Sequence, residues 1–312
     1  MRVVFFGTPE VAVPYLDAMV AAGHEIAAAV TQPDRPAGRG RRPQPSPVKQ
    51  AAIERDIEVL EPESAAEESF VQRIRELAPQ VGVVVAYGQI LRSALLAVPS
   101  VAFVNVHYSL LPLLRGAAPV HGALRRGMTR TGVTVQHLAA KMDAGDIIIQ
   151  RELPINDDDD RGTLTDRLTE IGTGALVEAL ALLAAGQAPR IPQDHAQATV
   201  QGRVSSEDCR VDWSAPAEEM RDLVRACTPW PGAWAMLGER RVKLVKIAGI
   251  QKILSEGGRP GEVVELREEE GPVVRSAAGS VVILRLQPPG KRVMSGAEFL
   301  RGARLAVGDR FD

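Results

Sequence analysis

The sequence predicts an α/β fold: an N-terminal Rossmann-like domain with a doubly wound, mostly parallel sheet, then a smaller C-terminal OB-like β-barrel domain. Short apolar runs of the buried parallel-strand type alternate with helical patterns in the first half of the chain. Short alternating segments between Gly and Pro turns fill the last third, as in small barrels. The 312 residues are enough for two domains, which we expect at 1–188 and 206–312 with a linker at 189–205.

The elements of the first domain follow from its apolar patterns. Arg2 to Phe6 predicts the first strand, and Pro9 suits the first turn of a helix that Gly23 ends. Further strands are expected at 25–31, 57–60, 81–86, 101–107 and 132–138 and from 147 on, and helices at 47–56, 64–77, 117–126 and 163–185, with a short helical or looped stretch at 89–98. G-x-G-x-x-G is absent after the first strand, so the dinucleotide-binding fingerprint fails. The turn at 156–160 is acidic and expected to be solvated.

The second domain is expected to start with one helix and to continue in strands. The helix is expected at 215–227, the strands at 233–237, 241–247, 261–266, 271–276 and 280–286, and a closing helix at 294–300. Its positive charge is bunched in two short stretches, 240–246 and 291–304.

Composition and charge exclude several classes of protein. A formal net charge of −2 gives no general attraction to polyanions, so a nucleic acid would need a local basic patch. The N-terminal apolar run is too short for a signal sequence, and no run approaches the roughly 20 residues that span a bilayer. The cytoplasm is therefore the expected location. Cys209 and Cys227 show neither metal-ligand nor disulfide-scaffold spacing, and the histidines lack H-x-x-x-H spacing, so no metal is expected.

Residues 32–49 form a segment of a different kind. It holds five prolines, two glycines and a local charge of +4, and it predicts a long irregular loop. Such a loop in an arbitrary protein is best interpreted as solvated and mobile. A cluster of arginines on a loop is also how proteins reach phosphates, because guanidinium groups bind them bidentately. The sequence alone leaves both interpretations open.

The strand that starts at Val101 ends in polar groups. Asn105 and His107 are alternate residues, so they share a face at the carboxyl end of a strand, where open α/β sheets place their chemistry. Asp143 follows 36 residues after the histidine, in the loop after the next strand, and a carboxylate there could orient the imidazole. An amide and an imidazolium are suitable donors to an oxyanion.

No nucleophilic elbow G-x-S-x-G is present, so these residues favour acyl transfer in which a substrate amine attacks a bound acyl donor. Each residue alone has a structural explanation: a buried histidine at a strand end, an asparagine in a turn, an aspartate that caps a turn or helix.

Several motifs resemble the 10-formyltetrahydrofolate-dependent formyltransferases. They are Asn105-Val106-His107, Ser109-Leu110-Leu111-Pro112, Arg115-Gly116-Ala117-Ala118-Pro119 and Met142-Asp143-Ala144-Gly145-Asp146. Thr31 to Gly40 and Gln287 to Lys291 narrow the resemblance to the branch that formylates methionyl initiator tRNA. The resemblance runs almost end to end. It implies the Rossmann-like and OB-like domains and, as partners, 10-formyltetrahydrofolate and initiator methionyl-tRNA; we expect a monomer with no membrane partner.

The resemblance also implies roles for residues. Asn105 and His107 would stabilise the oxyanion, and Asp143 would orient His107 and help to move the proton off the amine. The folate would lie along Tyr87, Gly88, Gln89, Ile90, Leu91, Ser109, Leu110, Leu111 and Pro112. The tRNA would contact Arg35, Arg39, Arg41, Arg42, Lys243, Lys246, Lys291 and Arg292.

The sequence departs from the family at Tyr108, where a glycine is usual. The alternation of the strand predicts that Tyr108 points away from His107 and Ser109. Two other functions stay open at this point. One is a formyltransferase for a small amine such as a nucleotide sugar or glycinamide ribonucleotide; the other is an inactive, OB-containing RNA-binding protein.

Overall fold

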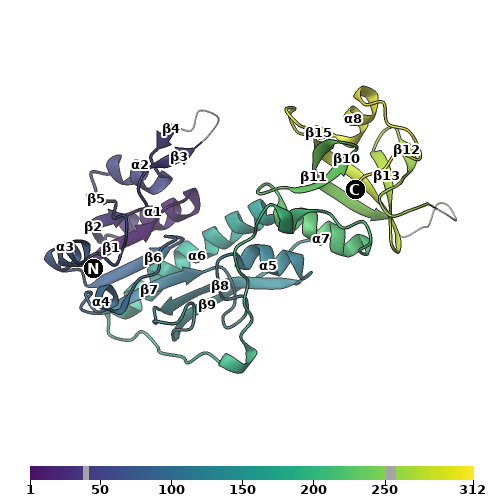
Figure 1. Ribbon diagram of the computed structural model, residues 1–312. Helices are drawn as coiled ribbons and strands as arrows, with labels where there is room; N and C mark the ends of the chain where they lie inside the picture. The colour runs from purple at the N-terminus through teal and green to yellow at the C-terminus, as the bar shows by residue number, and fades with distance from the viewer. Residues whose placement is uncertain (38–41, 251–257) are drawn as a thin grey trace. The chain divides into compact units, whose positions relative to one another are not determined.

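A computed structural model describes residues 1–37, 42–250 and 258–312, which form two compact units (Figure 1). The first unit comprises Met1–Pro119, Arg130–Pro154 and Thr165–Gln201, and the second comprises Val120–Thr129, Ile155–Leu164 and Gly202–Asp312. Two short segments that precede residue 165 are thus part of the second unit. The linear domain boundaries at 188 and 206 remain a prediction.

A seven-stranded sheet is the centre of the first unit. Its order is β5-β2-β1-β6-β7-β8-β9. The strands are β1 (Arg2–Gly7), β2 (Glu25–Val30), β5 (Val59–Leu60), β6 (Val81–Val85), β7 (Ala102–His107), β8 (Arg130–His137) and β9 (Ile147–Pro154). The first five strands in that order pair in parallel, whereas β8 and β9 are antiparallel additions at one edge. The predicted Rossmann-like, mostly parallel sheet is confirmed.

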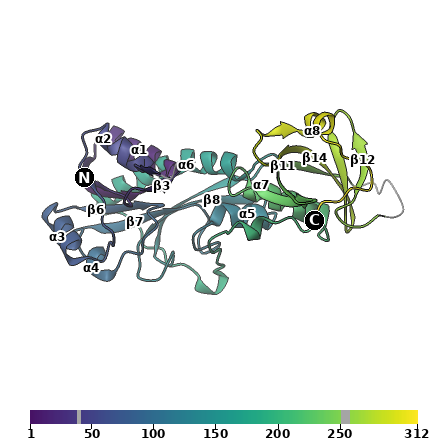
Figure 2. The ribbon, with the colours of Figure 1, turned by 45° about the horizontal axis from the view of Figure 1, so that its top comes forward.

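Helices cover both faces of this sheet (Figure 2). They are α1 (Val13–Ala21), α2 (Pro47–Ile53), α3 (Glu68–Glu76), α4 (Ser93–Leu96) and α6 (Arg161–Ala184), with the short 3-10 helices η1 (Glu10–Ala12) and η2 (His195–Gln197). Phe70 and Ile74 of α3 and Leu95 of α4 pack in one apolar core with Phe6 and Phe103 of the sheet. The helices α1 and α6 lie on the other face.

The described parts of the segment 32–49 contain regular structure, so the prediction of a long irregular loop was wrong in part. Strands β3 (Arg35–Ala37) and β4 (Arg42–Gln44) form an antiparallel hairpin in which Pro36 pairs with Pro43. A two-stranded ribbon tolerates proline because each strand has one edge that needs no hydrogen bond. Arg39 and Arg41 lie outside the described residues.

The second unit is built on an antiparallel sheet of order β10-β11-β14-β13-β12, with β15 paired to β14. Its elements are α5 (Pro119–Arg125), η3 (Glu207–Cys209), α7 (Ala217–Cys227), β10 (Ala233–Leu237), β11 (Arg240–Ile250), β12 (Val263–Arg267), β13 (Gly271–Ser276), β14 (Gly279–Gln287), β15 (Met294–Ser295) and α8 (Gly296–Gly302). The end of the chain joins the two edge strands of this sheet, because Phe311 bridges Leu237 of β10 while Arg310 bridges Glu262 beside β12. This closure agrees with the predicted barrel.

The acidic turn at 156–160 is not fully solvated, contrary to the expectation from its charge. Asp159 is buried, and its carboxylate accepts hydrogen bonds from the Asn156 amide at 2.7 Å and the Thr163 hydroxyl at 3.1 Å. Aspartate side chains cap turns in this way. These hydrogen bonds fix the backbone of the turn that leads into α6. Among the described helices, none is long and apolar enough to cross a bilayer.

Phe311→Ala is expected to destabilise the chain by about 3–5 kcal/mol, the usual cost of deleting a buried aromatic ring. The Phe311 ring is fully buried and lies 5.8 Å from the Trp213 ring, centroid to centroid. Urea unfolding followed by circular dichroism measures the change. The matched control is Val307→Ala in the same tail, where the side chain is 61% exposed and the change should stay within about 0.5 kcal/mol. Equal effects of both variants would show that the tail does not close the barrel.

Candidate active site

The strand β7 positions the predicted amide and imidazole. It lies between β6 and β8, with Asn105 opposite Val84 on one side and Gln136 on the other. The Asn105 amide donates one N–H to the Val84 carbonyl at 3.2 Å, which leaves its second N–H for another acceptor. His107 is buried and its Nε2 lies 2.9 Å from the Leu114 carbonyl oxygen. Because a carbonyl only accepts, Nε2 carries a proton and Nδ1 is the nitrogen left for chemistry.

Asp143 faces that second nitrogen. Its Oδ1 lies 3.8 Å from His107 Nδ1, which is longer than a hydrogen bond, and its Oδ2 accepts from the Gly116 amide at 2.8 Å. The structure therefore brings together the three residues that the sequence singled out. A small movement of either side chain would bring the pair from 3.8 Å to hydrogen-bonding distance.

Strained backbone surrounds this group. Ala86 after β6, Leu114 after β7 and Asp143 after β8 have φ of 50°, 56° and 49°, and they are three of the five non-glycine residues with positive φ in the described part of the chain. Side chains disfavour this conformation, and strain of this kind gathers at functional sites. At Leu114 it accompanies a carbonyl aimed at His107.

A buried glutamine connects Asn105 and Asp143, and sequence reasoning missed it. The Gln136 Nε2 lies 3.3 Å from Asp143 Oδ1 and 3.5 Å from Asn105 Oδ1, and its Oε1 accepts from the Gln193 amide at 3.2 Å. The available signal was a glutamine within the apolar run 132–138, where a buried polar group needs partners.

Gln193 clamps the loop that carries Asp143. Its Nε2 donates to the carbonyls of Asp143 at 3.0 Å and Gly145 at 2.7 Å, and its Oε1 accepts from the Arg115 guanidinium at 2.6 Å. Gln193 and Val200, which bridges Arg115, both fall in the segment predicted as a linker. This segment therefore packs against the site within the first unit instead of only connecting domains.

Two glycines allow the loops to approach each other. A Cβ on Gly116, whose φ is 108°, would lie 2.5 Å from the Gln201 carbonyl, and one on Gly145 would lie 1.8 Å from the His137 carbonyl. Both contacts are with backbone, which cannot swing away. The hydrogen bond from Gly116 to Asp143 thus depends on glycine.

Gln136→Leu is expected to lower kcat by about 10–100-fold with little change in KM, because Asp143 and Asn105 both lose the group that positions them. The steady-state rate of the formyl transfer that the family resemblance implies measures the change. Thr131→Val is the matched control: Thr131 is also buried on β8, and its hydroxyl has no hydrogen-bond partner among the described residues. If the Gln136 variant is as active as the control, the glutamine has only a structural role.

The turn after β7, expected to hold folate, is braced from within. The Ser109 hydroxyl donates to the Leu113 carbonyl at 2.6 Å, and the Leu111–Pro112 bond is cis. The Thr134 hydroxyl of β8 donates to the Ser109 carbonyl at 2.6 Å and accepts from the Leu111 amide at 3.1 Å. Thr134, which the sequence did not single out, therefore fixes the shape of this turn. Leu110 is half-buried and Leu111 buried.

The other segment expected at the folate starts where β6 ends. The Tyr87 ring is buried against Phe6, with 5.5 Å between ring centroids, so it anchors the loop to the apolar core. Gln89 accepts from the Ala65 amide at 2.7 Å and anchors the loop to its neighbour. Ile90 is 81% exposed and is the apolar side chain that this segment offers to a ligand, beside Gly88 and the half-buried Leu91.

Tyr108 lies on the face opposite His107, as the alternation of the strand predicts. Its hydroxyl lies 2.7 Å from the Thr169 hydroxyl and accepts from the Tyr15 hydroxyl at 3.0 Å. Burial raises the pKa of Tyr108. The departure from the family at this position is absorbed by packing against α1 and α6, away from the catalytic face.

The basic residues expected to bind tRNA differ in their local pairing. Arg35 is exposed on β3, and Arg42 begins β4. The other members of the set lie in the second unit: Lys243 donates to the Pro231 carbonyl, Lys246 pairs with Asp158, Arg292 pairs with Glu298, and Lys291 is exposed. Exposed ion pairs of this kind contribute little free energy, so they do not prevent these side chains from contacting phosphates. Lys49, counted in the charge of the loop, is paired with both Asp34 and Glu61, and hydrogen bonds to Glu61 and then Asp34 raise its pKa.

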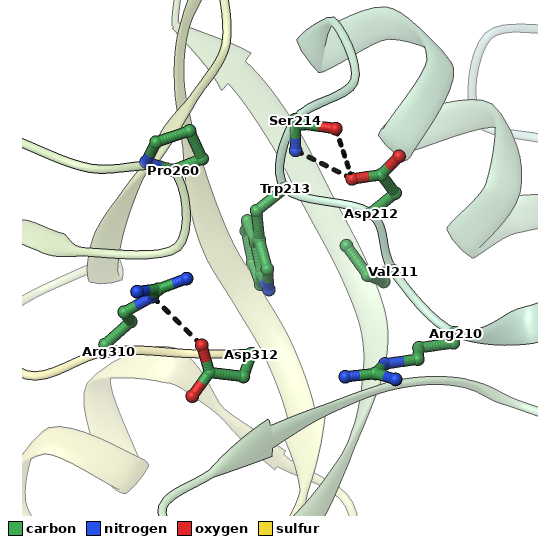
Figure 3. Close-up of a pocket in the computed structure, with 8 residues that line it drawn as sticks. All are labelled: Arg210, Val211, Asp212, Trp213, Ser214, Pro260, Arg310 and Asp312. Carbon is green, nitrogen blue, oxygen red and sulfur yellow. Dashed lines mark hydrogen bonds and ion pairs between the residues drawn. The ribbon is translucent and has the colours of Figure 1, made fainter.

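A pocket of about 530 Å³ lies elsewhere, in the second unit (Figure 3). It is lined by Arg210, Val211, Asp212, Trp213, Ser214, Pro260, Arg310 and Asp312. Four of its polar residues are paired with each other, since Asp212 accepts from Ser214 and Arg310 pairs with Asp312 at 2.9 Å. None of the three catalytic candidates lines it, so this pocket is not where they react.

A strand-end amide, imidazole and carboxylate, together with a second unit built as a closed antiparallel barrel, fit the class of group transferases. The chain belongs to the formyl transferase family: the family profile matches residues 1–180, and the profile of the formyl transferase C-terminal domain matches residues 203–304. It is 43% identical over 311 residues to the methionyl-tRNA formyltransferase of Moorella thermoacetica, covering 99% of this chain and 98% of the relative. It is 41% identical to that of Heliobacterium modesticaldum, with both chains covered completely.

Solved structures show the same fold at lower identity. HypX from Aquifex aeolicus in complex with tetrahydrofolic acid matches with a TM-score of 0.66 and 18% identity, over 96% of this chain and 47% of that one. The sugar 3N-formyltransferase WlaRD matches with a TM-score of 0.67 and 14% identity, over 94% and 99%. At these identities the likeness is one of fold.

Proposed function

We propose that this chain transfers the formyl group of 10-formyltetrahydrofolate to the α-amino group of methionyl initiator tRNA. One observation carries the proposal: Asn105, His107 and Asp143 converge at the end of β7 in a chain 43% identical, over almost its full length, to a methionyl-tRNA formyltransferase. The whole catalytic group comes from one chain, so we propose a monomer as the working unit, in the cytoplasm where translation starts.

The geometry assigns a part of the reaction to each group. The methionyl amine attacks the formyl carbon, a new C–N bond forms, and the bond from that carbon to the folate nitrogen breaks. The free N–H of Asn105 and the imidazole of His107 would donate to the formyl oxygen as it becomes negative, where preorganised donors are worth several kcal/mol. Asp143 would hold the imidazole and take up the proton that the amine loses, and this proton ends on the folate nitrogen.

The folate would lie against two loops that leave adjacent parallel strands. The loop after β6 carries Ile90, and the turn after β7 carries Ser109 to Pro112. Val84 and Asn105, which lie shortly before this loop and this turn, are paired in the sheet. Exposed Ile90 would offer apolar contact, and the turn braced by Thr134 would offer a fixed wall.

The tRNA would contact the basic hairpin and the exposed cations of the barrel unit. These contacts are electrostatic, so the affinity should fall as the salt concentration rises. A formyltransferase for a small sugar amine is the second candidate, because WlaRD has the same fold. A formyltransferase that acts on a small amine does not need an arginine-rich hairpin to bind its substrate.

One assay separates the two candidates. The protein is incubated with 10-formyltetrahydrofolate and either methionyl initiator tRNA or a nucleotide-linked amino sugar, and formyl incorporation is followed. We expect rapid transfer to the tRNA and none to the sugar. Transfer to the sugar at an equal rate, or no transfer to the tRNA, would refute the proposal.

Arg35→Ala combined with Arg42→Ala is expected to raise KM for the tRNA by about 10-fold and to reduce the salt dependence of binding by about two ion equivalents. Binding of folate should not change, which fluorescence titration checks. Arg75→Ala is the matched control, because Arg75 is an exposed arginine of the first unit paired with Glu68. The sequence predicts the same for Arg39, which lies outside the described residues. If the kinetics on tRNA are unchanged, the hairpin is a solvated segment that does not bind tRNA.

A further inference from the structure

Three ligand-type side chains meet in the interior of the second unit, and the reaction proposed above uses none of them. His121 comes from α5, Cys209 ends η3 and Cys227 ends α7. Both cysteines are free thiols and fully buried, and His121 is 6% exposed. Their ligand atoms all lie within 4.8 Å of one another. We propose that His121, Cys209 and Cys227 form a binding site for a thiophilic d10 cation, Zn²⁺ in the first place.

The spacing suits a metal. With Zn–S bonds of about 2.3 Å and Zn–N bonds of about 2.0 Å, a sulfur and a nitrogen ligand of one tetrahedral zinc lie about 3.6 Å apart. Cys227 Sγ and His121 Nε2 lie 3.7 Å apart. A cation could therefore enter between them with small movements of the side chains.

The backbone around the two sulfurs is held in place. The Cys209 amide donates to the Ser206 carbonyl at 3.2 Å, and the Val211 amide that follows donates to the Trp234 carbonyl of β10 at 2.8 Å. The Cys227 carbonyl accepts from the Gly232 amide at 2.9 Å. Ligands on rigid elements make a preorganised site.

Two arginines act on the sulfurs of the cluster, although the hydrogen bond to Cys209 and burial raise the pKa of the Cys227 thiol. The guanidinium of Arg161 interacts electrostatically with both cysteines, and that of Arg125 with Cys227. Nearby cations stabilise a thiolate, which is the form that binds metals. Two thiolates and one neutral imidazole would also balance the charge of a divalent cation in this buried place.

The histidine has no other evident hydrogen-bonding purpose. Its Nδ1 finds no partner among the described residues, while Nε2 is the atom aimed at Cys227. The described residues offer no fourth histidine, cysteine or carboxylate ligand to this group, so the remaining position would go to water. The sequence did not predict the site because its ligands lie 88 and 106 residues from His121, without local metal spacing.

The test starts with the wild-type protein, reduced and freed of metal. Titration with Co²⁺ should give one equivalent bound, with the thiolate-to-cobalt charge-transfer absorption and the visible bands of a four-coordinate ion, and Zn²⁺ should displace it. Zn²⁺ should also protect both thiols from alkylation, with protection lost on adding a chelator. These readouts need neither variants nor catalytic activity. Absence of the cobalt bands, or equal alkylation with and without Zn²⁺, would overturn the proposal.

Variants then assign the ligands. Cys209→Ser, Cys227→Ser and His121→Gln should each weaken Co²⁺ binding by at least about 10-fold. His137→Gln is the matched control, a histidine equally buried at 6% exposure in the first unit, and it should bind as the wild type does. Chains isolated from cells without metal and with the two sulfurs joined in a disulfide would also overturn the proposal and make the cysteines a redox pair.

Discussion

Asp143→Asn is expected to lower kcat for formyl transfer by about 10²–10⁴-fold, the range that proton transfer by a positioned side chain contributes. Asparagine has nearly the same shape, and its oxygen can still accept from the Gly116 amide that lies 2.8 Å from Oδ2. It cannot take up the proton of the attacking amine, and it carries no charge to hold the imidazole of His107. We therefore expect an intact fold, a nearly unchanged KM for the tRNA and a loss confined to turnover.

Asp146→Asn provides the control for this experiment. Asp146 belongs to the same loop but is partly exposed and paired with Arg190 at 3.6 Å, so its loss should change kcat by less than about 2-fold. Circular dichroism and thermal melting would show that both variants fold. A rate for Asp143→Asn within a few-fold of the wild type would leave the carboxylate as a cap of the loop.

Local periodicity accounts for what the sequence predicted well. A strand alternates its side chains every two residues whatever surrounds it, so the order of residues was enough to place Asn105 and His107 on one face. Apolar runs likewise predicted the parallel strands. They did not predict the antiparallel pairing of β8 and β9. Antiparallel pairing at that edge depends on how the chain turns back after α5, which no local pattern records.

Contacts that join distant parts of the chain account for what was missed. Gln136 and Gln193 lie 57 residues apart and look like ordinary polar residues until the fold places them around Asp143. The same holds for His121 and Cys227, 106 residues apart. The left-handed backbone at Leu114 was also unpredictable, because leucine adopts it only when surrounding contacts impose it.

His107→Ala is expected to lower kcat/KM by about 10²–10³-fold, the usual effect of losing one donor to an oxyanion. It should also destabilise the first unit by about 1–3 kcal/mol, because the buried Leu114 carbonyl loses the partner that lay 2.9 Å away. Activity on methionyl-tRNA and urea unfolding measure the two effects separately. His24→Ala, at a partly exposed histidine beside the N-terminus, should change neither by much.

Free imidazole distinguishes a chemical role of His107 from a structural one. The alanine variant has a cavity in which added imidazole can lie between the Leu114 carbonyl and Asp143, so part of the lost rate should return while the stability changes little. A histidine that only fills space and satisfies Leu114 would show the loss of stability with an almost normal rate and no gain from imidazole. That result would leave His107 a structural residue at the end of the strand, whereas recovery of the rate by imidazole would assign it a part in the chemistry.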